Sequence, residues 1–186
     1  MNLRSFVPPP ALPVAEPPAV GEAAPWWPEP GRSACVIAFL RHVGCPFAEA
    51  TVRSMREVAA LESDLEWWVV SHGSLEFTER WCGSFGGPGR VRVLEDESRG
   101  LYAAWGLPRS SAAHFLGVRS LLGVARLALR GVRNRQAAGT RWQTAGTFAV
   151  DASGIVRWRH LPSHAADLPD VNAAVAALRK TRETTD

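Results

Sequence analysis

The segment CVIAFLRHVGCPFA, from Cys35 to Ala48, begins as an apolar run and ends in a cysteine that is followed at once by proline. The consecutive apolar residues from Cys35 to Leu40 predict a strand that is covered on both faces. Pro46 fits the first turn of a helix, where a missing N–H group costs nothing. The segment therefore predicts a buried strand that leads to Cys45 at the start of a helix. Unpaired N–H groups and the positive end of the helix dipole at that position favour a thiolate.

The residues after Cys45 have helical spacing. One apolar stripe is expected to pack on the sheet, and it consists of Ala48, Val52, Met55 and Ala59. The charged residues of this segment lie off the stripe; they are Glu49, Arg53, Arg56 and Glu57. The cysteine is thus predicted to be carried by an amphipathic helix.

Further strands and helices alternate along the chain, which indicates an α/β fold. Strands are predicted at 65–71 and 91–94, a helix at 75–82, a hairpin at 148–150 and 155–158 with its turn at 151–154, and a final helix at 169–180.

Several of these segments, in this order, match a known pattern. They are Val93-Leu94-Glu95-Asp96, Leu101-Tyr102, Trp105-Gly106-Leu107, Gln143 to Asp151, Gly154-Ile155-Val156-Arg157, and the stretch from Arg159 to Asp170. With the cysteine segment, they resemble the thioredoxin-like superfamily, and within it the peroxiredoxin-like branch of the alkyl hydroperoxide reductase/thiol-specific antioxidant (AhpC/TSA) group. The resemblance spans about residues 33 to 180. It implies a three-layer α/β/α sandwich with a mixed central sheet.

The N-terminal region differs in composition from the rest. Nine prolines occur between residues 8 and 30, so residues 1–32 are predicted to form an extended, partly disordered arm. Residues 33–182 are predicted to form one thioredoxin-like domain, which suits a chain of 186 residues with 46% hydrophobic residues. The arm is either a ligand for a proline-recognising partner or a tail laid on the domain by Trp26 and Trp27.

Residues 114–136 are predicted to be an inserted amphipathic helix. Its apolar stripe is expected to comprise Phe115, Val118, Leu122, Ala125, Leu129 and Val132, and an adjacent basic stripe Arg119, Arg126, Arg130 and Arg133. The helix is expected to pack its apolar stripe beside the start of the Cys45 helix and to solvate its arginines. Alternatively, it makes a weak contact with an anionic membrane surface or an acidic protein. Nucleic acid is not an expected partner, since the net charge is only +3 and no aromatic and basic pattern for base stacking is present.

The resemblance implies a chemistry for Cys45. Its thiolate would attack a hydroperoxide, or a disulfide, and a hydroperoxide would leave a sulfenic acid. Dithiol oxidoreductases carry a second cysteine three residues later, where this chain has Ala48, so an external thiol, or else Cys82, would have to reduce the sulfenic acid. Cys35, inside the predicted strand, is expected to be inert.

Positive charge near the thiol is expected to assist this reaction. Peroxiredoxins usually carry a threonine three residues before the reactive cysteine, where this chain has His42. Arg41 and His42 are therefore the cationic neighbours in sequence. The resemblance makes Arg141, just before the hairpin, the leading candidate for an arginine that binds the peroxide, with Arg109 second. The predicted catalytic set is Cys45, Arg141 and His42.

Other features of the sequence limit the alternatives. No segment has the ~18 apolar residues of a membrane span, and the N-terminus lacks a signal pattern, so a cytoplasmic location is expected. Three cysteines fit a reducing compartment.

His160 and His164 have the spacing of metal ligands on a helix, but Pro162 argues against a helix there, so neither a metal nor another cofactor is expected. A homodimer is possible. The competing function is a non-catalytic thioredoxin-fold module that binds a partner.

Overall fold

The computed structural model describes residues 7–25, 33–111, 114 and 117–183. A five-stranded mixed sheet, in the order β3-β2-β1-β4-β5, forms its centre. The strands are β1 (Cys35–Phe39), β2 (Glu66–Ser71), β3 (Arg92–Glu95), β4 (Gly146–Val150) and β5 (Val156–His160). β1 pairs with β2, and β2 with β3, in parallel, whereas β1 with β4 and β4 with β5 are antiparallel. The strand that leads to Cys45 is thus the central one.

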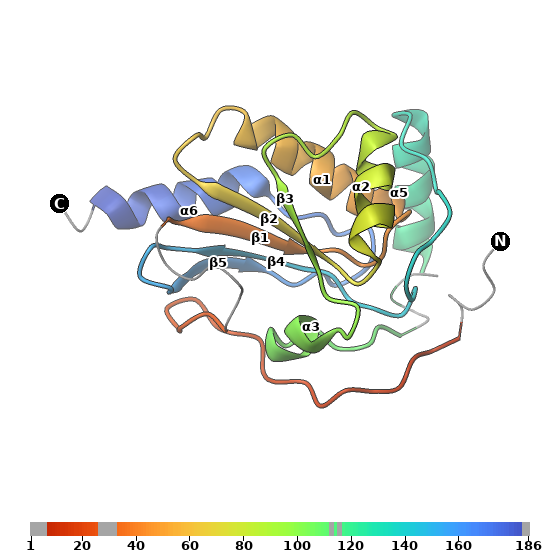
Figure 1. Ribbon diagram of the computed structural model, residues 1–186, viewed down its shortest axis with the longest axis horizontal. Helices are drawn as coiled ribbons and strands as arrows, with labels where there is room; N and C mark the ends of the chain where they lie inside the picture. The colour runs from red at the N-terminus through yellow and green to blue at the C-terminus, as the bar shows by residue number, and fades with distance from the viewer. Residues whose placement is uncertain (1–6, 26–32, 112–113, 115–116, 184–186) are drawn as a thin grey trace.

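Helices cover both faces of this sheet (Figure 1). They are α1 (Pro46–Ala59), α2 (Leu75–Gly83), α3 (Gly100–Ala104), α5 (Val118–Leu129) and α6 (Val171–Glu183). α1 and α6 lie on one face, and α5 stands at the end of the sheet beside the start of α1. The opposite face carries the short helix α3 and the N-terminal arm.

Two hydrophobic clusters form on the two faces, because successive side chains of a strand point in opposite directions. From β1, Val36 and Ala38 join Cys45 and the apolar residues of α1, α2 and α6 in one cluster. Ile37 and Phe39 join Tyr102 and Trp105, around α3, in the other. The predicted thioredoxin-like α/β/α fold with a mixed sheet is confirmed, and most predicted strands and helices differ from the observed ones by only a few residues at their ends. The helix predicted over residues 114–136 is shorter than expected: α5 ends at Leu129, and Gly131, with a φ of +78°, follows its end, so Arg133 lies outside the helix.

The described part of the arm, residues 7–25, lies along the face that carries α3 (Figure 1). Backbone hydrogen bonds fix it at Ala15, which donates to Ala103, and at Gly21, which donates to Val156. Arginine side chains of the domain donate to its free carbonyl groups at Pro9, Pro10, Pro17 and Pro18. Proline-rich backbone thus supplies acceptors to the domain. Trp26 and Trp27, which were expected to hold the arm, lie outside the described residues.

The orientation of α5 differs from the expected one. Four residues of the predicted packing stripe, Val118, Leu122, Ala125 and Leu129, are exposed, and only Val132, which lies after the helix, is buried among the members that the structure describes. The buried residues of this helix are Ser120 and Leu127. A Cβ atom at Gly123 would clash with Ala166 and would lie 3.0 Å from Cε1 of Phe47. Small residues let α5 approach α1 closely, so the helix does dock beside the start of α1, but through its other side. Phe115 lies outside the described residues.

Candidate active site

Cys45 occupies the N-cap position of α1. Its backbone is extended (φ −73°, ψ 130°), and Pro46 follows as the first helical residue. The backbone N–H of Glu49 donates to the carbonyl oxygen of Cys45 at 3.0 Å, which closes the first turn. Cys45 therefore stands at the end of the helix where backbone N–H groups lack intrahelical partners, although its side chain makes no capping hydrogen bond to them. The residue is only 1% exposed.

Arg41 brings a positive charge to the same place. It is buried, and its Nη2 donates to the carbonyl oxygen of Arg141 at 3.3 Å. Burial lowers the pKa of the Arg41 guanidinium, the nearby Cys45 thiol opposes this effect, and the charge of Arg141 adds to it. Arg41 is thus close enough to interact electrostatically with both Cys45 and Arg141. A guanidinium beside a thiol favours the nucleophilic thiolate.

Hydrogen bonds hold the end of β1, from which Arg41 extends. The Tyr102 hydroxyl lies 2.7 and 2.8 Å from the carbonyl oxygens of Leu40 and Val70. Nε2 of His72 donates to the carbonyl oxygen of Arg41 at 2.8 Å. Because Tyr102 is fully buried and His72 nearly so, these contacts fix the backbone that presents Arg41.

His42 does not supply the positive charge expected from its position in the sequence. Burial and the charge of Arg41 lower its pKa to about 3. Its Nδ1 donates to the carbonyl oxygen of Val43 at 2.8 Å, which fits a neutral ring. At neutral pH, His42 is therefore an uncharged residue that shapes the turn before Cys45.

The segment after α5 covers that turn. The N–H of Arg135 donates to the carbonyl oxygen of Gly44 at 2.9 Å, and the N–H of Ala138 donates to that of Val43 at 3.3 Å. Gly44 has a φ of +86°, and a Cβ atom there would clash with the carbonyl oxygen of Gln136. Glycine is thus required at position 44 for both its conformation and its lack of a side chain. Backbone from residues 135–138 seals the approach to Cys45 from this side.

A buried carboxylate fastens this cover to α1. Glu49, which lies off the predicted apolar stripe, is fully buried. Its Oε1 accepts from Nε and Nη2 of Arg53 at 3.0 and 2.7 Å, and its Oε2 accepts from Nε of Arg135 at 3.1 Å. A buried carboxylate requires such partners, because an unpaired charge in the interior is costly. The ion pair of Glu49 with Arg135 therefore ties the cover to the first turns of the Cys45 helix.

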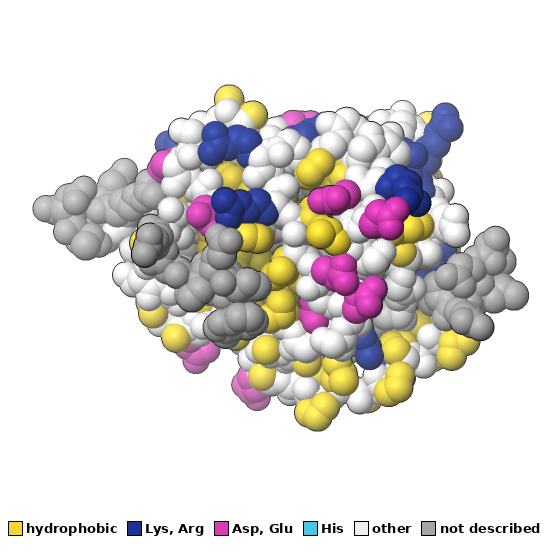
Figure 2. Space-filling view, in the orientation of Figure 1, with side chains coloured by type: hydrophobic (Ala, Val, Ile, Leu, Met, Phe, Trp, Pro, Cys, Tyr) yellow, Lys and Arg dark blue, Asp and Glu magenta, His cyan; other side chains and the backbone are white. Residues whose placement is uncertain are grey.

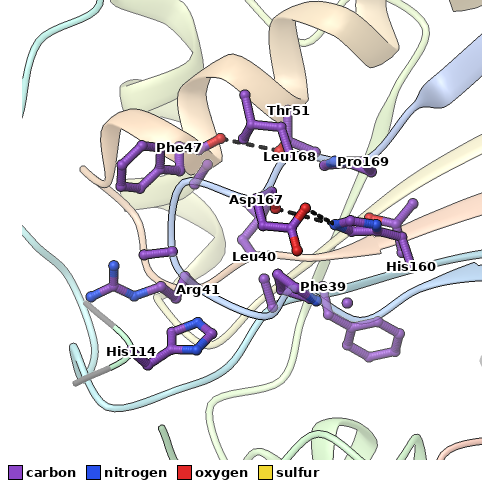
Figure 3. Close-up of a pocket in the computed structure, with 16 residues that line it drawn as sticks. Phe39, Leu40, Arg41, Phe47, Thr51, His114, His160, Asp167, Leu168 and Pro169 are labelled. Carbon is purple, nitrogen blue, oxygen red and sulfur yellow. Dashed lines mark hydrogen bonds and ion pairs between the residues drawn. The ribbon is translucent and has the colours of Figure 1, made fainter. Parts of the chain in front are cut away.

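A cavity lies on another side of the helix start (Figure 3). Its volume is about 30 Å³, which is space for about two water molecules. Arg41 and His114 line one end, Phe47 and Thr51 of α1 form a wall, and the rest is mainly apolar. Cys45 itself does not line the cavity. Arg41 reaches both the cavity and the thiol, so it links the two.

An acid and a base face each other at the far side of this cavity. Nε2 of His160 lies 3.4 Å from Oδ1 of Asp167 and 3.2 Å from the backbone oxygen of the same residue (Figure 3). Burial alone would raise the pKa of Asp167, but hydrogen bonds from Ser163 and the charges of His160 and His164 lower it overall. This pair closes the cavity. Among the described residues, no three His, Cys, Asp or Glu side chains are grouped so that they could hold a metal ion.

Comparisons with known proteins identify the family. Residues 55–164 match the family described as AhpC/TSA antioxidant enzyme. The chain belongs to the AhpC/TSA family. The match begins ten residues after Cys45, so it characterises the scaffold downstream of the thiol. Among curated proteins, no match was found.

Solved structures agree on the fold. A thiol peroxidase from Chromobacterium violaceum has a TM-score of 0.64 with 15% identity, over 91% of this chain and 91% of its own. A peroxiredoxin-like protein from Aquifex aeolicus gives 0.62 with 19% identity, over 90% of each chain. A yeast mitochondrial 1-Cys peroxiredoxin gives 0.58 with 12% identity, over 89% of this chain and 78% of its own.

The other two cysteines of this AhpC/TSA protein are in different surroundings. Cys35 points to the face of the sheet that carries α3, away from Cys45, and burial raises its pKa to about 12. Cys82 is on the same face as Cys45, but burial, followed by the charge of Glu79, raises its pKa to about 12 as well. All three cysteines are free and buried.

The two arginine candidates separate clearly. The charge of Arg141 acts on Arg41 and His42, so Arg141 lies near the turn before Cys45. Nη1 of Arg109 instead donates to the carbonyl oxygen of Pro9 in the arm at 3.2 Å. Sequence reasoning did not identify His72, Glu49 and Arg135 as neighbours of the thiol. Their local sequence does not indicate that they lie near Cys45. His72 bonds to Arg41, 31 positions earlier, and Arg135 bonds to Glu49, 86 positions earlier. Glu49 itself lies on a helix whose pattern is amphipathic.

Proposed function

We propose that this protein is a peroxiredoxin-like thiol oxidoreductase that reduces hydroperoxides with a single redox cysteine, Cys45. The proposal rests mainly on the position of the Arg41 guanidinium. This group interacts with Cys45 at the start of α1 and lines the adjacent cavity. A group in that position can stabilise the thiolate and polarise a bound peroxide through charge-assisted hydrogen bonds.

The reaction has two parts. The Cys45 sulfur attacks one peroxide oxygen, the O–O bond breaks, and the leaving oxygen takes a proton to become an alcohol or water, while sulfur is oxidised to a sulfenic acid. A first reducing thiol then displaces hydroxide from the sulfenic acid as water and forms a mixed disulfide. A second thiol releases Cys45 and leaves with the first as a disulfide.

Arg41 and Arg141 are proposed to bind the peroxide, and His42 to position the turn before the thiol. Arg141 lies beside Arg41: its carbonyl oxygen accepts from Nη2 of Arg41, and its charge adds to the larger effect of burial in lowering the pKa of Arg41. His42 is uncharged and is 2% exposed, so its role would be to shape the backbone rather than to transfer a proton. The cavity volume of about 30 Å³ suits hydrogen peroxide or a small organic hydroperoxide better than a bulky one.

An external thiol is proposed as the reductant. Ala48 occupies the position of a local partner, Cys35 is across the sheet, and Cys82 is fully buried and protonated at neutral pH. A 1-Cys peroxiredoxin with this fold is described as resolved through the glutathione and thioredoxin systems. A small thiol or a thioredoxin-like protein would serve this chain in the same way.

The burial of Cys45 favours the second candidate, a non-catalytic thioredoxin-fold interaction module. A thiol that is 1% exposed must be uncovered by a local opening before a peroxide can reach it. If the cover over residues 43–44 never opened, Cys45 would be a core residue.

Trapping of the sulfenic acid decides between the two functions. The purified protein receives one equivalent of hydrogen peroxide in the presence of dimedone, and the site of the adduct is found by mass spectrometry. We expect one adduct, on Cys45, that is absent in Cys45→Ser and retained in Cys82→Ser. An unmodified Cys45 in the folded protein, with no peroxide consumed in the presence of excess dithiothreitol, would support the interaction module instead.

A further inference from the structure

The outer side of α5 is an apolar surface without cover. Val118, Leu121, Leu122 and Leu129 are 73, 56, 55 and 90% exposed. With Ala125 they recur at intervals of three and four residues, so they form one stripe along the helix. Contiguous exposed apolar side chains of this size mark an interaction site on a soluble domain.

The stripe lies directly opposite the side by which α5 is attached. At 100° per residue, the buried residues Ser120 and Leu127 are on the far side of the helix from Val118 and Leu129. Gly123 holds the attached side against Phe47 and Ala166. A rotation of the helix to bury the stripe would break these contacts, so the exposure follows from how α5 packs.

Arginines border this stripe. Arg119, Arg126, Arg130 and Arg133 are exposed, and in the part of the chain that the structure describes none of them forms an ion pair. Figure 2 shows dark blue side chains at the upper right edge, where Figure 1 places α5. From Gly117 to Arg133 the sequence contains four arginines and no acidic residue, although the whole chain has a net charge of only +3. Positive charge is therefore concentrated on this helix and the turn that follows it.

We propose that the outer side of α5 binds an anionic lipid surface. Arg119, Arg126 and Arg130 all project from one side of the apolar stripe, since they are at about 80 to 120° from Val118 at 100° per residue. A helix lying in the plane of a bilayer can insert such a stripe between the acyl chains, while long arginine side chains reach the phosphate groups. The absence of acidic residues from this stretch removes repulsion from the lipid headgroups.

Charge argues against the main alternative, a second copy of this chain. Two copies that met through this surface would bring eight exposed arginines together with no acidic residue from either stretch to neutralise them. An acidic protein partner has suitable charge. However, the stripe runs along the outer side of a helix at the edge of the molecule (Figure 1), and a lipid surface needs no matching groove to accept it.

The experiment uses the full-length protein and sedimentation with vesicles. Phosphatidylcholine vesicles with phosphatidylserine should pellet the protein at low salt, and pure phosphatidylcholine vesicles should not. High salt should weaken the binding, because it screens the arginines from the headgroups. Leu121→Ser with Leu129→Ser should lower the affinity about tenfold, and Arg126→Gln with Arg130→Gln by a similar factor.

Matched controls test whether the effect is local to α5. Leu61→Ser removes a leucine that is 83% exposed at the end of α1, and Arg80→Gln removes an exposed arginine of α2. Neither change should alter binding. All of these residues are at the surface, so circular dichroism should show folded variants.

Three results would overturn the proposal. The first is no binding to phosphatidylserine vesicles at low salt. The second is binding that the α5 variants leave unchanged. The third is no vesicle binding together with another association that the α5 variants abolish. A dimer in sedimentation equilibrium would assign the surface to a second copy of this chain. A complex with polyglutamate would assign it to an acidic protein. None of these results depends on whether Cys45 reacts with peroxide.

Discussion

Cys45 and Cys82 lie in the same hydrophobic cluster but at opposite ends of their helices. Cys45 is the N-cap of α1, where the helix dipole is positive and Arg41 is close. Cys82 is the next-to-last residue of α2, where the dipole is negative, and burial and Glu79 raise its pKa to about 12. Both thiols are nearly inaccessible to solvent. The comparison leads us to expect that two equally buried thiols of this fold differ in reactivity according to the direction of the helix and the nearest charge.

The largest effect that the comparison predicts is a difference in alkylation. A small reagent such as iodoacetamide at neutral pH should modify Cys45 about a thousandfold faster than Cys82, since a thiol with a pKa of about 12 has almost no thiolate. Peptide mass spectrometry against time measures both rates. In denaturant the two rates should become similar. Equal rates in the folded protein would mean that the position at the helix start has no influence on Cys45.

The second largest predicted effect is a loss of folding stability in acid. Burial lowers the pKa of His42 to about 3 and that of His72 to about 4, so the folded protein holds both rings neutral while the unfolded chain binds protons below about pH 6.5. Stability is therefore complete above that pH and is lost as the pH falls toward the folded-state values. Between about pH 6.5 and pH 4, the two histidines together should lower the folding equilibrium constant about a hundredfold for each unit by which the pH falls.

Urea unfolding between about pH 7 and pH 4 measures this dependence. His72→Gln cannot ionise, so it should remove about half of the slope. A free energy of unfolding that stays constant across this range would contradict the neutral, buried state of both rings.

Loss of the Arg41 charge should have a smaller effect. Arg41→Met keeps the apolar stem but removes the group that interacts with Cys45, and we expect the rate of peroxide consumption to fall at least about tenfold. Arg56→Met is the matched control, because Arg56 is the arginine beside Cys82. If both variants lost activity to the same extent, general destabilisation rather than local charge would be responsible.

The smallest predicted effect concerns the cover over Cys45. Arg135→Gln removes the contact that ties residues 135–138 to Glu49 and should increase alkylation of Cys45 about threefold through more frequent local opening. Arg133→Gln, in the same segment but without contact to Glu49, should leave the rate unchanged. A rate unaltered by Arg135→Gln would mean that the two backbone hydrogen bonds to residues 43 and 44 are sufficient to hold the cover.

The sequence was a good guide to the fold because continuous apolar runs and turn residues are local signals. The segment from Cys35 to Leu40 became the central strand β1, and Cys45 began a helix as predicted. The match of the downstream segments to the AhpC/TSA family was also correct. Cys45, Arg141 and His42 as catalytic residues stay a prediction.

Contacts between distant segments were harder to predict. For α5, the stripe with the largest apolar residues was taken as the buried side, but Ser120 and Gly123 allow the closest approach to α1. Close packing stabilises a contact between helices as well as the burial of apolar surface does, so the side with small residues can be the buried one even when the other side carries leucines. Similarly, a carboxylate on an amphipathic helix is usually solvated. Glu49 can be buried because Arg135 pairs with it, and Arg135 lies 86 positions later in the sequence, where local patterns do not reveal the contact.

The glycine before Cys45 has a consequence for the history of this protein. Because the carbonyl oxygen of Gln136 occupies the space of a side chain at position 44, the two segments cannot change independently. A relative that lost or shortened the stretch around residue 136 would be released from this clash and could carry asparagine or aspartate, which tolerate a positive φ, at position 44. A relative that kept the stretch would need glycine. Aligned sequences should therefore show covariation between position 44 and the presence of the inserted segment.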